Sequence, residues 1–112
     1  MDAYNANPTS MSAAIRNFAQ ADYSNKVIIL GAMMELGTMS VDEHQQIVRL
    51  LQQSNWNHVL LVGGDFKDLQ HSYTYFDDAG QAAEWYRNAN LSNTAILIKG
   101  SRSLAMEKVL KS

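Results

Sequence analysis

The residues best suited to chemistry follow three short apolar runs, residues 26–30, 58–62 and 95–99. Each run is rich in valine, isoleucine and leucine, and a glycine follows each one. Such runs are typical of buried parallel strands, whose carboxyl ends meet at one edge of a sheet. Ligands of open α/β sheets bind at that edge. The segments GAMMELG, GGD and KGSRS are therefore the candidate site loops.

The side chains of these loops suit anion binding and close backbone approach. Lys99 and Arg102 flank a glycine and would suit a carboxylate or phosphate, although an ordinary surface pair explains them too. Glu35 lies between two apolar residues just beyond a strand, where a carboxylate needs a polar partner. The glycines permit either ligand approach or tight turns, and the sequence leaves both interpretations open for Gly31, Gly63, Gly64 and Gly100.

Other chemistry has weaker support in the sequence. Ser101 and Ser103 have no histidine base that can be assigned to them, so helix capping explains them better than nucleophilic catalysis. The histidines lack metal-site spacing, and we expect His44 on a helix surface and His58 and His71 at strand or loop edges. No metal ligand is expected. Met33 and Met34 are interpreted as core residues.

Composition narrows the class of protein. The chain has 112 residues, 46% of them hydrophobic, and a net charge of -2. One domain is expected, and there is no basic surplus to favour nucleic acid or an anionic membrane surface. Cysteine is absent, which excludes disulfides and thiolate chemistry. Neither a signal peptide nor a membrane-spanning run is recognisable, so we expect a cytoplasmic location.

Strand and helix patterns alternate along the chain. A weaker fourth strand is predicted at residues 73–76, and a helix should begin at Asn7 and Pro8. Ser40 and Glu43 predict a capping box that opens a second helix to about residue 54. Further helices are predicted after Asp77 and, briefly, from near Ser103. This alternation predicts an α/β fold with an open, mostly parallel sheet and helices on both faces.

Neither the phosphate loop G-x-x-x-x-G-K-[ST] nor the G-x-G-x-x-G fingerprint occurs in the chain. The sequence therefore predicts no complete nucleotide-phosphate cradle within these residues.

Four segments carry a resemblance that covers nearly the whole chain. In order and spacing, DAYNANPTSM, LGAMMELG, His44 and KGSRSLAMEKV resemble the C-terminal domain of the Mur ligases. The resemblance is strongest to the branch that adds D-alanyl-D-alanine to UDP-N-acetylmuramoyl-tripeptide in peptidoglycan precursor synthesis. It implies a three-layer, Rossmann-like domain, numbered here 1–112, as the third domain of an ATP-dependent amide ligase.

In such ligases the central domain holds the phosphate loop and Mg2+, and the N-terminal domain holds the UDP end of the substrate. The substrate carboxylate is phosphorylated to an acyl phosphate, which the incoming amine then attacks while the third domain closes over the central one. The resemblance implies that this chain alone is not catalytic. It also leads us to expect that Met1 cuts into the first strand of the family's third domain.

The resemblance also assigns site residues by matching positions. The residues expected to face ATP are Asp2, Tyr4, Asn5 and Asn7. Those expected near the substrate or the domain interface are Gly31, Glu35, His44, Lys99, Gly100, Ser101 and Arg102. One position departs from the family pattern, since Ala32 stands where the family usually has aspartate, which puts any polar contact of this loop in doubt.

Two alternatives stay open at this stage. One is another amide ligase of the same superfamily, such as a folylpolyglutamate synthase or a different Mur ligase. The other is a stand-alone ligand-binding or regulatory domain, for example a phosphate-receiving one, for which Lys99 at a strand end would be suitable. Such a receiver needs clustered acidic residues at its strand ends, and only Asp65 comes near.

Overall fold

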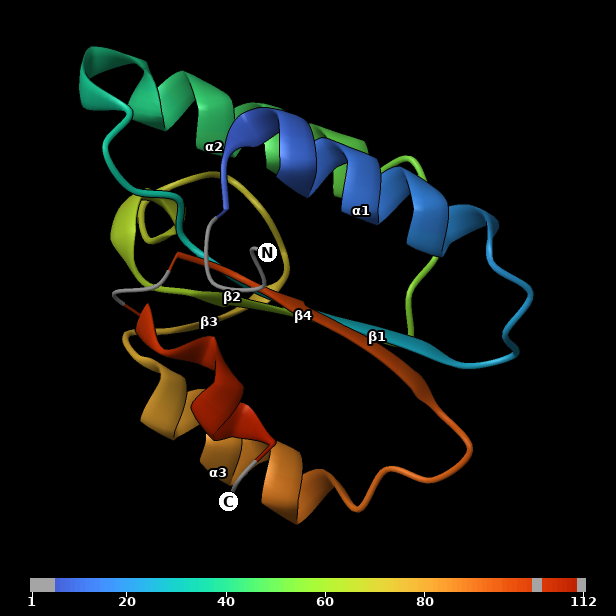
Figure 1. Ribbon diagram of the computed structural model, residues 1–112. Helices are drawn as coiled ribbons and strands as arrows, with labels where there is room; N and C mark the ends of the chain where they lie inside the picture. Colours follow the sequence, from blue (N-terminus) through green and yellow to red (C-terminus); the bar gives the residue numbers. More distant parts are fainter. Residues whose placement is uncertain (1–5, 102–103, 111–112) are drawn as a thin grey trace.

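The fold is a parallel α/β sandwich, seen in a computed structural model that describes residues 6–101 and 104–110 (Figure 1). Its four-stranded sheet has the order β3-β2-β1-β4, and all strand pairs are parallel. The strands are β1 (Lys26–Gly31), β2 (His58–Val62), β3 (Thr74–Phe76) and β4 (Ala95–Lys99). The α-helices are α1 (Pro8–Gln20), α2 (Ser40–Leu51) and α3 (Ala79–Ala89).

The helices form two layers around the sheet. Figure 1 shows α1 and α2 side by side over one face, with α3 and the short 3-10 helix η4 (Met106–Val109) on the other. The predicted fold class is thereby confirmed, and so is the weaker strand β3. Within the described residues, no helix is both long enough and apolar enough to cross a bilayer.

The central strand β1 divides the core into two clusters. Ile28 and Leu30 face the layer of α1 and α2, whereas Val27 and Ile29 face α3 and η4. This alternation follows from the two-residue period of a strand. Because both faces are covered, the strand is apolar at every position from 27 to 30, as its sequence predicted.

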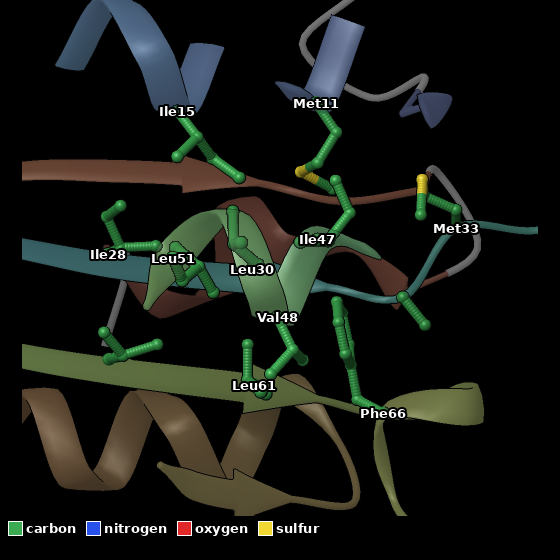
Figure 2. Packing of buried hydrophobic residues seen from close by; sticks show 12 residues of the cluster. Met11, Ile15, Ile28, Leu30, Met33, Ile47, Val48, Leu51, Leu61 and Phe66 are labelled. Carbon is green, nitrogen blue, oxygen red and sulfur yellow. The ribbon is translucent and has the colours of Figure 1, made fainter. Parts of the chain in front are cut away.

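The cluster under α1 and α2 contains the largest buried side chains. Figure 2 shows Met11 and Ile15 of α1 above β1, with side chains of α2 beside them. Phe66, from the 3-10 helix η2 (Gly64–Phe66), closes the cluster near the carboxyl ends of the strands. Burial of each such side chain stabilises the fold by about 1.5–3 kcal/mol.

The start of α1 agrees with the prediction. The Asn7 side-chain oxygen accepts a hydrogen bond from the Ser10 amide at 2.9 Å, and Pro8 takes the first helical position. The Ser10 hydroxyl oxygen in turn accepts from the Asn7 amide at 3.2 Å. This reciprocal pair satisfies two amides that a helix start otherwise leaves unpaired.

The capping box predicted for the start of α2, formed by Ser40 and Glu43, was wrong. Ser40 is already helical, because the 3-10 helix η1 (Gly37–Met39) runs directly into α2, and Met39 at the N-cap makes no side-chain capping bond. The helix also ends at Leu51 rather than near residue 54. Beyond it the Ser54 amide donates to the Leu51 carbonyl at 3.2 Å, so the chain turns there.

The predicted last helix was also wrong. Its expected start at Ser103 lies outside the described residues, and the chain beyond it forms the four-residue η4 in place of an α-helix. Ala105 has a φ of +50°, which is incompatible with a continuous α-helix from that side. Leu110, expected on the apolar face, is 57% exposed.

Replacing Asn7 tests the capping role. We expect Asn7→Ala to lower the free energy of unfolding by about 1 kcal/mol, because the Ser10 amide loses its acceptor. Asn7→Asp keeps a side-chain oxygen in place and should retain most of that stability. Urea unfolding midpoints of the two variants measure the difference, and equal midpoints would argue against the cap.

Candidate functional site

The predicted site loops meet at the carboxyl edge of the sheet. The Ala32 amide donates to the Val62 carbonyl at 2.9 Å, and the Ala32 carbonyl accepts from the Ser101 amide at 3.3 Å. The Gly63 amide continues the line by donating to the Phe76 carbonyl at 2.9 Å. The residue after β1 therefore joins the ends of β2 and β4, and the structure brings all three candidate loops together.

The glycines of this edge make room for the chain's own side chains. A Cβ at Gly31 would lie 2.8 Å from the Met106 sulfur, and one at Gly63 would lie 3.1 Å from Leu104. A Cβ at Gly100 would lie 2.6 Å from Met106 Cγ and 2.9 Å from the Gly31 Cα. Neither ligand approach nor a tight turn is needed to explain glycine at these positions, because Leu104 and Met106 pack directly against them.

Ala32 also lies in tight packing. Its side chain is fully buried, and a Cβ at Gly64 would lie 2.5 Å from the Ala32 Cβ. Gly64 has a φ of +53°, a region that glycine adopts at little cost. The small side chain at position 32 therefore contributes packing rather than a polar contact.

Glu35 is presented outward in a strained conformation. Its φ is +62°, unusual for a residue with a side chain, and the residue is exposed. It has no hydrogen bond or ion pair with the described residues, so the polar partner expected from the sequence is not found among them. Met33 is buried as predicted, but Met34 is 40% exposed, so its assignment to the core was wrong.

His44 is buried, which corrects the expected surface position. The Met33 amide donates to its Nε2 at 2.9 Å, and its Nδ1 lies 2.7 Å from the Ser40 carbonyl oxygen. The ring edge packs against Phe66 with centroids 4.7 Å apart. The sequence held a signal that was missed, because positions 44, 47, 48 and 51 share the helical spacing of one buried face.

The remaining predicted residues divide between the edge and the undescribed part of the chain. Lys99 ends β4 opposite Leu30 and is half-buried, and the carbonyl of the largely buried Ser101 accepts from the Leu104 amide at 3.1 Å. Asn7 is exposed at the start of α1. Asp2, Tyr4, Asn5 and Arg102 lie outside the described residues, so their assigned roles stay predictions.

The other two histidines have local partners. His58 packs its ring edge against Trp85 with centroids 5.0 Å apart. His71 Nδ1 accepts from the Tyr73 amide at 3.1 Å, and its Nε2 donates to the Phe66 carbonyl at 3.3 Å. Across residues 6–101 and 104–110, no group of three histidine, aspartate or glutamate side chains is arranged to hold a metal ion.

Two tyrosines at or next to β3, Tyr73 and Tyr75, have shifted pKa values. Burial raises the pKa of Tyr73 above its ordinary value. Burial, followed by the charge and hydrogen bond of Asp77 and the charge of Asp68, raises the pKa of Tyr75. A raised tyrosine pKa adds stability below pH 10 that is lost as the pH rises through the folded value. Both phenols are therefore neutral near pH 7 and provide no switch there.

The described surface has hollows away from the predicted loops. One of about 610 Å³ lies between α1 and β4, lined mainly by apolar groups such as Phe18, Ile96 and Leu97. Another of about 340 Å³ lies at the amino ends of β2 and β3, around Trp56 and Tyr73. Neither includes a predicted site residue. Neither hollow is lined by an acidic side chain.

A family model described as "Mur ligase, glutamate ligase domain" matches residues 1–102 of this sequence. The chain belongs to this Mur ligase domain family.

Curated relatives carry one printed name, UDP-N-acetylmuramoyl-tripeptide--D-alanyl-D-alanine ligase. The Bacillus subtilis (strain 168) protein is 33% identical over 98% of this chain and 26% of its own length. The Rickettsia prowazekii (strain Madrid E) protein is 31% identical over 97% of this chain and 26% of its own length. The chain therefore spans about a quarter of these relatives.

Solved structures support the same fold. MurF from Acinetobacter baumannii superposes with a TM-score of 0.78 and 29% identity, over 96% of this chain and 25% of that one. MurF ligase from Thermotoga maritima in complex with ADP gives a TM-score of 0.79 over 96% of this chain and 26% of that one. At 23% identity, this second match shows the fold alone.

The packing role of the edge glycines can be tested at Gly100. We expect Gly100→Ala to destabilise the domain by roughly 1–3 kcal/mol, because the new methyl group meets backbone as well as Met106. Gly80→Ala is the matched control, since its Cβ would contact only the Asp78 side chain at 3.2 Å within α3. Thermal unfolding of both variants measures the difference. Equal stability would contradict the packing role.

Backbone strain at Glu35 makes a second prediction. Glu35→Gly should raise the free energy of unfolding by about 0.5–1 kcal/mol, because glycine adopts positive φ without the steric cost. Glu35→Gln keeps the strain and removes only the charge, so its stability should match the parent. Denaturant midpoints compare the three proteins. A destabilised glycine variant would contradict the strain at this position.

Proposed function

We propose that this chain is the C-terminal domain of an ATP-dependent ligase that joins D-alanyl-D-alanine to UDP-N-acetylmuramoyl-tripeptide in peptidoglycan precursor synthesis. The observation that carries the proposal is the shared name of curated relatives matched over nearly all of this chain. The alternative of a phosphate-receiving domain has less support, because the residues after β1 and β2 are Ala32 and Gly63 rather than acids.

The geometry supports a domain that contributes to the reaction by docking its surface against another domain. Leu104 and Met106 fill the crevice at the carboxyl edge, so a substrate cannot sit between the strand ends. The loop at residues 33–37 instead projects beyond the edge, with Met34 and Glu35 exposed. A domain of this kind serves a ligase by closing against a reaction centre held elsewhere, which excludes water from an acyl phosphate.

The remaining parts of the reaction are assigned to other domains of the same ligase. ATP and Mg2+ would be held there, and among the described residues no group of three histidine, aspartate or glutamate side chains could hold the metal. Asp2, Tyr4, Asn5 and Asn7 are proposed to face ATP on closure. The residues proposed to lie near the incoming dipeptide or the domain interface are Gly31, Glu35, His44, Lys99, Gly100, Ser101 and Arg102. Of these, the buried His44, Gly31 and Gly100 would act only through the neighbouring residues that they position. The ligase would act in the cytoplasm.

The activity is tested with the complete ligase that carries this domain. We expect the ligase to form the pentapeptide product and ADP from ATP, the UDP-tripeptide and D-alanyl-D-alanine, as followed by coupled phosphate release and mass spectrometry. The 112-residue chain by itself should form no product. Turnover with glutamate or glycine, but not with the dipeptide, would favour another amide ligase of the superfamily.

Asp2→Ala in that ligase tests the proposed ATP-facing role. We expect kcat to fall at least tenfold and the KM for ATP to rise, because a group that meets the nucleotide on closure is lost. Asp22→Ala removes an exposed carboxylate in the turn after α1 and should leave both constants unchanged. If the two variants behave alike, Asp2 has no such role.

A further inference from the structure

The buried ring of His44 makes two hydrogen bonds to the main chain, one through each ring nitrogen. The Ser40 carbonyl oxygen, 2.7 Å from Nδ1, can only accept, and the Met33 amide, 2.9 Å from Nε2, can only donate. Nδ1 therefore donates to the carbonyl, and Nε2 accepts from the amide. These two contacts define one tautomer, and the side chain is fully buried.

These hydrogen bonds connect the loop after β1 to the first turns of α2. Met33 lies beyond the end of β1, so no neighbouring strand accepts its amide, and an unpaired buried amide would be costly. His44 lies in the first turns of α2, and its ring is held in place by Phe66 of η2. The ring thus fixes the exit of the loop relative to α2 and η2, on one face of the sheet.

The loop has few other anchors. Met34 and Glu35 form no hydrogen bond with the described residues, and the next main-chain bond joins the Met39 amide to the Leu36 carbonyl at 3.1 Å. Glu35 also keeps its positive φ in this interval. A strained, exposed residue persists only when its surroundings determine the backbone, and the bond at Met33 is the anchor immediately before it.

We propose that His44 is a positioning residue, whose Nε2 acceptor fixes the Met33 amide and thereby the direction in which residues 34–36 leave the carboxyl edge. Its consequence for catalysis rests on the proposed function, in which this loop faces the rest of the ligase. His44 itself touches no substrate, because its ring is enclosed by its own domain.

The first test uses this chain labelled with 15N. We expect a through-hydrogen-bond coupling between the Met33 amide nitrogen and His44 Nε2. His44→Leu, which removes the acceptor, should speed hydrogen exchange of the Met33 amide at least tenfold more than exchange of the Ala32 amide. Ala32 is the internal control, since it donates to Val62 and not to the ring. His44→Gln places an amide oxygen near the Nε2 position and should restore most of the Met33 protection.

The second test measures the loop's use in the complete ligase. We expect His44→Leu to raise the KM for D-alanyl-D-alanine or lower kcat at least tenfold at a temperature where the variant is fully folded. His44→Gln should recover most of the loss. Recovery by His44→Gln separates positioning of the loop from a contribution to folding stability. If the ring only stabilised the fold, its replacement would lower the unfolding temperature but would not change kcat or KM in the folded ligase.

The proposal is overturned by an absent coupling, by equal acceleration at Met33 and Ala32, or by unchanged kinetics in a variant whose Met33 amide has been released. An inactive parent ligase would refute the proposed function instead. In that case the exchange pattern of the isolated chain still decides whether His44 positions the loop.

Discussion

The close approach of the strand ends is the constraint on which the carboxyl edge depends. One residue, Ala32, hydrogen-bonds through its amide to the end of β2 and through its carbonyl to the segment after β4. At Gly100 a Cβ would meet the backbone of Gly31 as well as Met106, whereas at Gly31 it would meet the side chains of Met106 and Leu104. The glycines are thus required by the packing of the sheet edge, before any ligand is considered.

The same packing supports the proposed place of action of the domain. In many open α/β folds the carboxyl edge forms a crevice for a ligand. Here Leu104 and Met106 occupy the space above the glycines. The strained residue Glu35 lies farther out, on the loop between β1 and η1. A surface that projects and a crevice that is filled together suit a domain that docks against a reaction centre. They suit a domain that encloses its own substrate much less well.

The sequence predicted the features that depend on local patterns. The buried runs of β1, β2 and β4 appear as apolar strands, and Asn7 with Pro8 determines the start of α1 through neighbouring residues only. The glycines were ambiguous because their partners Leu104 and Met106 follow β4, far from Gly31 in the sequence.

His44 was misplaced because polarity was given more weight than its helical spacing with Ile47, Val48 and Leu51. Its buried partner, the Met33 amide, depends on how a loop leaves the sheet, which no local pattern encodes. The cap of α2 failed for a related reason, since η1 supplies a preceding helical turn that the Ser40 and Glu43 spacing does not reveal. The meeting of the three candidate loops at one edge was predicted, whereas the packing of that edge required tertiary structure.

Hydrogen exchange of the complete ligase, with and without ATP and the UDP-tripeptide, can show which edge of the domain meets the reaction centre. We predict that substrate-driven closure slows exchange in residues 33–37 and 100–101, at the carboxyl edge. Exchange should stay unchanged in residues 54–57, which line the hollow at the opposite edge. Protection confined to residues 54–57, or no change at the carboxyl edge, would contradict the claim that this domain acts by presenting its carboxyl edge to the reaction centre.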